Sequence, residues 1–249
     1  MPCQVRGRGW HRGGMRWAEP ARRVGRLVVP VACPGCGLVD ERWCDECEAP
    51  WWEPPVRCET GAARLEALEP PLPVWSVAVL DGAAHSLLAA WKDAGRRDLG
   101  ALLGPAMARA AGSLAPALAL GLRGATLAVV PCPARTVHTR RRGVDVPALL
   151  AGQAAAGLAA RGVPAAASSL LRPERGGSRG RGDRGRWRAV APRVLAPGRR
   201  GGPVLLVDDV VTTGATLARA AAALAGAGWV PVGGLVLASA PGPGVSSGT

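Results

Sequence analysis

The sequence lacks two of the three large aromatic residue types and almost all lysine. It contains no tyrosine, no phenylalanine and a single lysine, Lys92, whereas arginine supplies the rest of its 31 basic residues. Nine tryptophans, 35 glycines and 23 prolines complete a one-sided composition that is typical of compositional drift. Residue bias by itself therefore carries no functional weight, and the function has to be sought in local motifs.

Long apolar segments are also missing. No run of eighteen apolar residues occurs, which excludes a transmembrane helix on length. The apolar stretch 27–32 follows Arg22 and Arg23 but is too short for the core of a secretory signal. The sequence therefore predicts a cytoplasmic protein with no membrane span. Met15 is an alternative start to Met1.

The net charge of +13 is concentrated in two stretches. Residues 1–32 carry a net charge of +6 and residues 172–200 a net charge of +8, so the rest of the chain is almost neutral. Such basic segments either contact a polyanion, for example single-stranded DNA, or are solvated arginine-glycine linkers with no dedicated partner. The sequence leaves both interpretations open.

The length of 249 residues suits one α/β domain with its own core and a small appendage. Hydrophobic patterns predict strands at 74–80, 126–130, 204–207 and 230–238 and helices at 85–94, 100–122 and 216–225, the second broken at 104–105 and 115–116. We therefore expect a mainly parallel sheet flanked by helices over 70–240. Within it we expect a flexible loop over 172–200. Outside it we expect a flexible N-terminus over 1–29, a cysteine-rich unit over 30–58 and a flexible tail over 241–249.

The strongest motif begins with the apolar run 204–207, which Asp208 and Asp209 follow. The run predicts a buried strand, and ligands of α/β sheets bind at the carboxyl ends of strands. The turn after it opens a helix, whose first amides have no partner inside the helix and whose positive dipole end favours an anion. The motif predicts a phosphate site beside two carboxylates that accept hydrogen bonds from a ribose diol. A buried strand followed by a threonine-capped helix is the alternative.

Five residues of this turn are candidate phosphate ligands. Gly214 can bring backbone amides close to a ligand, and the threonine hydroxyls can donate to phosphate oxygens or cap the helix. The candidates are Thr212, Thr213, Gly214, Ala215 and Thr216.

Four cysteines form two C-x-x-C pairs that are separated by seven residues: Cys33, Cys36, Cys44 and Cys47. Four thiolates at this spacing suit one tetrahedral zinc ion, with reduced free thiols as the alternative. Because all four ligands would be sulfur, no coordination position is left for water, and the zinc would be structural. Cys3, Cys58 and Cys132 have no partner at ligand spacing, and the three histidines also stand alone.

Tryptophans accompany the cysteine pairs at positions 43, 51 and 52. They either stack on the bases of a nucleic acid or pack against the main domain, and packing is the commoner use.

A second cationic feature lies at the end of the predicted helix 85–94. Lys92 and Arg96 are four residues apart, so a helix that continued through Gly95 would point both side chains the same way. Two cations on one face suit a pyrophosphate group, and a solvated basic helix end is the alternative.

Three segments together resemble a known family. Residues 204–217 resemble the phosphoribosyl-pyrophosphate (PRPP) motif of type I phosphoribosyltransferases. Residues 90–99 resemble the Leu-Lys-x-x-Gly-Arg-x-x-Leu segment of the competence protein F (ComF) family, and 131–135 with 140–143 resemble that family's Pro-Val-Pro and Arg-Arg-Gly elements. With the cysteine pairs in front, the resemblance covers about residues 30–238. It implies a type I phosphoribosyltransferase-like domain preceded by a small zinc ribbon.

The resemblance also implies ligands and roles. PRPP or another phosphorylated ribose would bind with Mg²⁺, and Asp208 and Asp209 would hold the ribose and its metal. The turn 212–216 would hold the 5′-phosphate. Lys92, Arg96 and Arg142 would stabilise the leaving pyrophosphate. The phosphoribosyl group would pass to a nitrogen nucleophile.

Two functions remain open at this stage. The first is a phosphoribosyltransferase-domain protein linked to competence and DNA uptake. The second is a non-enzymatic accessory protein for single-stranded DNA, with DNA-uptake proteins as partners and a sensory or vestigial PRPP site. Val144-Asp145-Val146 stands where the family has Phe-Asn-Gln, and this departure favours binding over turnover.

Overall fold

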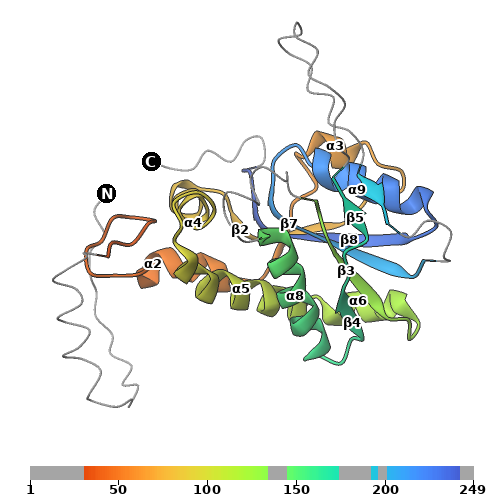
Figure 1. Cartoon of the computed structure of the whole chain (residues 1–249), viewed down its shortest axis with the longest axis horizontal. Coiled ribbons are helices and arrows are strands. Elements are labelled where there is room, and N and C mark those ends of the chain that lie inside the picture. The colour runs from red at the N-terminus through yellow and green to blue at the C-terminus, as the bar shows by residue number, and fades with distance from the viewer. Residues whose placement is uncertain (1–30, 134–144, 174–191, 196–200, 242–249) are drawn as a thin grey trace, which may run out of the picture.

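The computed structural model describes residues 31–133, 145–173, 192–195 and 201–241 (Figure 1). Its centre is a six-stranded sheet in the order β1-β2-β8-β7-β3-β4, in which β1 is antiparallel to β2 and every other pair is parallel. A two-stranded antiparallel sheet joins β5 to β6. The strands are β1 Val56–Arg57, β2 Val74–Val79, β3 Leu127–Pro131, β4 Ala165–Ala167, β5 Leu171–Arg172, β6 Arg193–Val194, β7 Pro203–Val211 and β8 Val230–Ser239.

Helices cover both faces of the sheet. In Figure 1, α3 and α9 lie above the strands, whereas α5, α6 and α8 lie below them. The helices are α2 Asp45–Glu48, α3 Ala63–Glu66, α4 Gly82–Lys92, α5 Gly100–Ser113, α6 Ala115–Leu122, α8 Val146–Ala159 and α9 Ala215–Gly226, with 3-10 turns η1 at Ala49–Trp52 and η2 at Arg97–Leu99. This arrangement confirms the expected α/β class with a mostly parallel sheet.

The apolar run of the central strand β7 is continuous because both faces of the strand are buried. Leu205 and Val207 pack into the core under α5 and α8, whereas Val204 and Leu206 pack into the core under α9. Because side chains alternate between the faces of a strand and both faces are covered, all four positions must be apolar. Helix α9 lies where the sequence predicts a helix and buries one stripe of side chains against the second core: Leu217, Ala220, Ala221 and Leu224.

Two local predictions need correction. The acids were expected after the end of their strand, but β7 continues through Val211, so Asp208 and Asp209 lie inside it. The predicted break at 104–105 is also wrong, because α5 runs through Pro105 without interruption. Burial of Leu102, Leu103, Ala106 and Met107 along this helix outweighs the hydrogen bond that proline cannot donate. The second break is confirmed, since α6 begins at Ala115.

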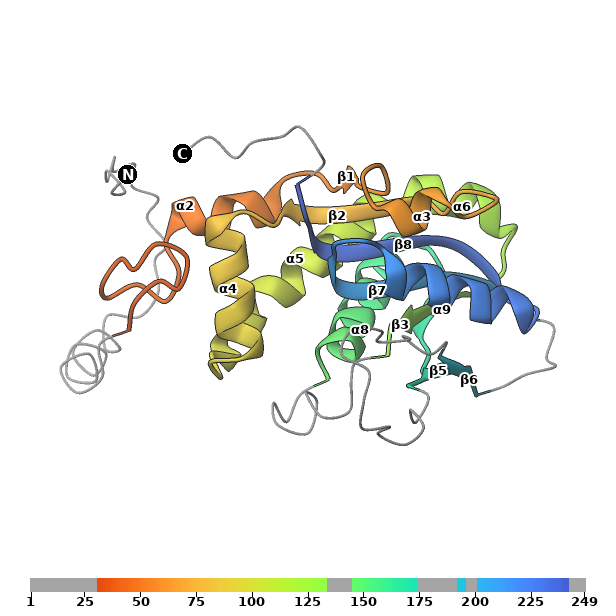
Figure 2. The same ribbon diagram turned by 90° about the horizontal axis from the view of Figure 1, so that it is seen from above.

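The part of the cysteine-rich segment that leads into α2 lies at one end of the molecule, on the side of α4 and far from α9 (Figure 2). Cys33, Cys44 and Cys47 belong to the same hydrophobic cluster as α4, α5 and α8, and Trp51 is fully buried there. The segment therefore shares a core with the sheet. No helix in the described ranges is both long and apolar enough to cross a membrane.

The contact between α5 and α8 depends on a glycine. A Cβ atom at Gly157 would lie 1.9 Å from the carbonyl oxygen of Ala108, whereas one at Gly152, on the same helix, would meet nothing within 4 Å. We predict that Gly157→Ala forces the helices apart and lowers the free energy of unfolding by about 1–3 kcal/mol.

Gly152→Ala is the matched control and should raise the free energy of unfolding by about 0.5–1 kcal/mol, because alanine favours a helix over glycine. Urea denaturation of both variants measures the difference. Equal stabilities would show that α5 and α8 do not pack as described.

Candidate functional site: an acidic pair beside a helix N-terminus

The acidic pair lies between two neighbouring strands. Strand β7 pairs with β8 on one side, where Asp208 faces Val236, and with β3 on the other, where Pro131 faces Val207. Beyond the end of β3, the amide of Cys132 still donates to the carbonyl of Val207 over 2.7 Å. The acids therefore emerge near the carboxyl ends of three parallel strands, which is where α/β sheets bind ligands.

Asp208 is largely buried, with 9% of its surface exposed. Burial, reinforced by the neighbouring Asp209, raises the pKa of the Asp208 carboxyl to about 8. The Asp208 carboxylate also accepts a hydrogen bond from the backbone amide of Asp209 over 2.9 Å. The raised pKa favours the protonated form of Asp208 at neutral pH.

Lys92 supplies the opposite charge. Its ammonium nitrogen lies 2.6 Å from Oδ2 of Asp209, and both side chains are about four-fifths buried (19% and 17% exposed). Lys92 is the last residue of α4, a helix that begins where the side chain of Asp81 accepts a hydrogen bond from the amide of Ala84. The only lysine of the sequence thus contacts the acidic pair.

The phosphate-loop candidates surround a small pocket of about 50 Å³ lined by Asp208 and residues 210–217. Gly214 adopts a φ of +72°, which an L side chain rarely takes, and it is the residue from which α9 begins. No side chain caps α9 there, so the threonine-cap alternative is not observed. Thr212, Thr213 and Thr216 are exposed instead. The start of α9 faces an open polar hollow with its amides available.

A residue that sequence reasoning missed fixes this loop. The side chain of Leu65 in α3 packs over Gly214 so closely that a Cβ atom there would lie 2.4 Å from its Cγ. The amide of Arg64 donates to the carbonyl of Thr213 over 3.0 Å. Helix α3 is only four residues long, too short to show the hydrophobic periodicity of a helix. About 150 residues of chain separate it from the loop. Nothing in the local sequence could have indicated this contact.

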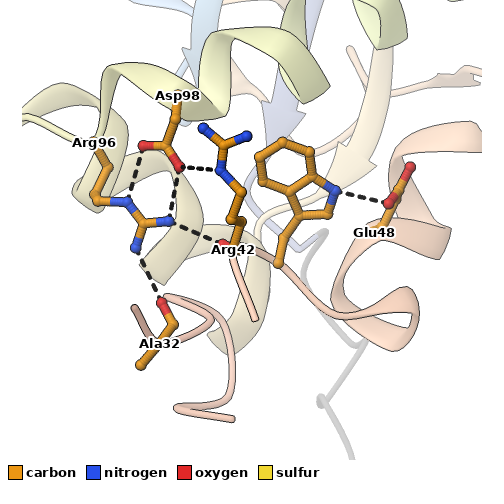
Figure 3. A network of polar contacts seen from close by, with 6 residues as sticks. Ala32, Arg42, Glu48, Arg96 and Asp98 are labelled. Atoms are coloured by element: carbon orange, nitrogen blue, oxygen red, sulfur yellow. Dashed lines mark hydrogen bonds and ion pairs between the residues drawn. The ribbon is translucent and has the colours of Figure 1, made fainter. Parts of the chain in front are cut away.

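Arg96 does not join Lys92 at the acidic pair, which corrects the prediction. Helix α4 ends at Lys92, and Gly95 takes a φ of +73°, so the chain turns before Arg96. The guanidinium donates to the carbonyls of Ala32 and Arg42 over 3.0 Å each and to the carboxylate of Asp98 (Figure 3). Arg142, the third predicted pyrophosphate ligand, lies outside the described residues.

The four predicted metal ligands come together. The sulfur atoms of Cys33, Cys36, Cys44 and Cys47 all lie within 4.8 Å of one another. Zinc–sulfur bonds of about 2.3 Å at tetrahedral angles place sulfurs about 3.8 Å apart. The observed separations of Cys44 from Cys33 and Cys36 are 3.9 and 3.5 Å, so the cluster fits a zinc ion. Neither Cys58 nor Cys132 belongs to it.

Local backbone geometry favours a thiolate at Cys33. Gly37 takes a φ of +79° after Cys36, and its amide donates to the carbonyl of Cys33 over 2.8 Å, so the first knuckle turns tightly. Burial raises the pKa of the Cys33 thiol, but hydrogen bonds from backbone amides outweigh it and lower that pKa to about 7. Burial raises the pKa of Cys47. A metal ion would stabilise all four thiolates together.

The three tryptophans beside the cysteines differ in their surroundings. The indole nitrogens of Trp43 and Trp52 each donate to the carboxylate of Glu48 over 2.8 Å, and Trp51 is buried in the core. Residues 31–58 contain six acidic residues and only two arginines. A negatively charged unit is poorly suited to the phosphate backbone of a nucleic acid.

No model of a known protein family matches this sequence, and no curated protein matches it. The resemblance to the ComF family therefore stays an expectation, and the function has to be argued from the site.

We predict that the purified protein binds one zinc ion per chain. Cys36→Ser removes the exposed ligand and should weaken zinc binding by at least about tenfold, since even outer-shell changes at metal sites cost about 10–100-fold. Cys58→Ser, outside the cluster, should keep the wild-type affinity. Elemental analysis after dialysis against a weak chelator measures both. A wild-type protein free of zinc, or equal retention in the two variants, would contradict the assignment.

Proposed function

We propose that this protein binds PRPP with Mg²⁺ at the carboxyl end of β7 and transfers its phosphoribosyl group to a nitrogen nucleophile. One observation carries the proposal. A buried acidic pair with a lysine counter-ion lies directly beside a hollow at the uncapped N-terminus of α9. Such an arrangement places carboxylates that can accept hydrogen bonds from sugar hydroxyls next to a site for a phosphate group.

The hollow at 212–216 suits the 5′-phosphate. Its volume of about 50 Å³ suits a small anion. The first amides of α9 and its dipole favour negative charge, and the exposed hydroxyls of Thr212, Thr213 and Thr216 can donate to the remaining oxygens. Contact with Leu65 keeps the Gly214 turn in place, so the amides are positioned before a ligand arrives.

The acidic pair suits the ribose. Asp208 and Asp209 can accept hydrogen bonds from the 2- and 3-hydroxyls of a sugar whose phosphate occupies the loop. Their carboxylate oxygens are also ligands that Mg²⁺ prefers, together with phosphate oxygens. Mg²⁺, when bound, would neutralise charge on the pyrophosphate and lower the barrier to its departure.

Lys92 would exchange partners when the ligand binds. In the free protein its ammonium group neutralises Asp209. A pyrophosphate group that enters beside the acids brings more negative charge than one carboxylate, so Lys92 would turn to it and leave Asp209 for the ribose. The lysine then stabilises charge on the leaving group, and the acids position the sugar rather than take part in bond formation.

The reaction balances without another reagent. The bond between ribose C1 and the pyrophosphate oxygen breaks, and its electron pair leaves with pyrophosphate. A nitrogen lone pair forms the new bond to C1, and the nitrogen loses a proton to solvent. The sequence resemblance to the ComF family supports this assignment and links it to DNA uptake. The alternative accessory role in DNA binding gains no support from the acidic cysteine unit.

Titration calorimetry with PRPP and Mg²⁺ tests the proposal. We predict binding to the wild-type protein and a loss of affinity of at least about a hundredfold in Asp208→Asn/Asp209→Asn, because several charge-assisted hydrogen bonds disappear. The change at 208 removes a buried acid whose pKa is raised, whereas the change at 209 leaves Lys92 without its ion-pair partner, so thermal unfolding must show that the double variant is still folded.

The exposed neighbours Asp40 and Glu41 give a matched control, since Asp40→Asn/Glu41→Gln also neutralises two adjacent acids. It should bind PRPP like the wild type.

Lys92→Met should weaken PRPP binding more than ribose 5-phosphate binding, because only PRPP carries the pyrophosphate. Absence of binding to the wild type, or equal losses in both double variants, would refute the site.

A further inference from the structure

A seven-residue segment connects the candidate ligand site to the cysteine cluster. Lys92 begins the segment with its ion pair to Asp209, and Asp98 ends it with a bidentate ion pair to Arg96. Arg96 reaches backbone carbonyls more than 50 positions earlier in the chain (Figure 3). The same short stretch thus contacts both candidate centres.

The carbonyls that Arg96 contacts belong to both cysteine knuckles. Ala32 immediately precedes Cys33, and Arg42 lies two residues before Cys44. Asp98 orients the guanidinium by accepting from Nε and Nη2 over 2.9 Å each. This contact holds the pKa of the Asp98 carboxyl below its usual value. Through these hydrogen bonds the planar guanidinium group of Arg96 connects the backbone beside both C-x-x-C pairs to the segment that follows α4.

The segment itself is well fixed. Gly95 has a φ of +73°, which lets the amide of Arg96 turn back and donate to the carbonyl of Ala90 over 3.1 Å. Trp91 and Leu99, on either side, are both buried. A displacement of Arg96 therefore moves the end of α4, where Lys92 is attached, instead of being absorbed by a loose loop.

We propose that Arg96 is a positioning residue that couples the metal centre to the ligand site. A metal ion holds the two knuckles in the geometry that Arg96 requires, and Arg96 in turn holds the helix end that presents Lys92. Loss of the metal then weakens PRPP binding, and PRPP binding slows metal loss, since coupling between two binding sites is reciprocal. The ligand half of this inference rests on the proposed function.

The first experiment needs no PRPP. Zinc release from the purified zinc-loaded protein is followed with a chromogenic chelator, in the wild type, Arg96→Ala and Arg96→Lys. Loss of the charge-assisted hydrogen bonds should speed release about tenfold in Arg96→Ala. Zinc release from Arg96→Lys should be almost as fast as from Arg96→Ala, because an ammonium group cannot donate to the same set of acceptors.

Arg161→Ala is the control, since Arg161 is an exposed arginine at the end of α8 and not in the network. It should release zinc at the wild-type rate. Circular dichroism confirms that each variant is folded. Equal release rates in Arg96→Ala, Arg161→Ala and the wild type would overturn the proposal.

The second experiment measures PRPP affinity by calorimetry in the same proteins. Arg96→Ala should bind PRPP more weakly by about five- to tenfold, within the usual range of coupling between sites, and Arg161→Ala should be unchanged. Unaltered PRPP affinity in Arg96→Ala, with faster zinc release, would refute the coupling and leave the proposed function intact.

Amide hydrogen exchange tests the effect of the metal on the end of α4 even if the protein does not bind PRPP. If the wild type does not bind PRPP, the proposed function fails, but zinc removal should still speed exchange of the amides of residues 92–99. Protection of these amides that is independent of zinc would overturn the inference by itself.

Discussion

The ion pair between Lys92 and Asp209 is the interaction on which the rest of the site depends. Two adjacent carboxyl groups within a central strand, near its carboxyl end, repel each other, and burial penalises their ionised forms. A lysine 2.6 Å away offsets part of this cost. It must be delivered from α4, a helix outside the sheet, so the position of α4 becomes a requirement of the site. The Asp81 cap at the start of α4 and the Arg96 contacts beyond its end meet this requirement.

The cysteine cluster is then more than an appendage. Three of its cysteines share the core of α4, α5 and α8, and the backbone beside them accepts hydrogen bonds from Arg96. A metal ion there would stabilise one end of the domain and, through the end of α4, the position of Lys92. The acidic surface of the unit and the hydrogen bonds from Trp43 and Trp52 to Glu48 fit this supporting role better than contact with nucleic acid.

Local patterns predicted most of the fold and the cysteine cluster. The run 204–207, the helix over 216–225 and the two C-x-x-C pairs depend on spacing within a few residues, and each prediction agrees with the structure. Arg96 was assigned wrongly because its direction depends on the left-handed turn at Gly95 and on acceptors far away in the sequence. Leu65 was missed for the same reason. Pro105 was given too much weight because its helix is stabilised by tertiary burial, which local propensity does not include.

A crystal structure of the zinc-loaded protein with PRPP and Mg²⁺ would test the central claim most directly. The account predicts the 5′-phosphate on the amides of 212–216, the ribose hydroxyls on Asp208 and Asp209, and the ammonium group of Lys92 moved from Asp209 to the pyrophosphate. A ligand bound elsewhere, or bound here with the Lys92–Asp209 pair intact and the phosphate loop empty, would contradict it.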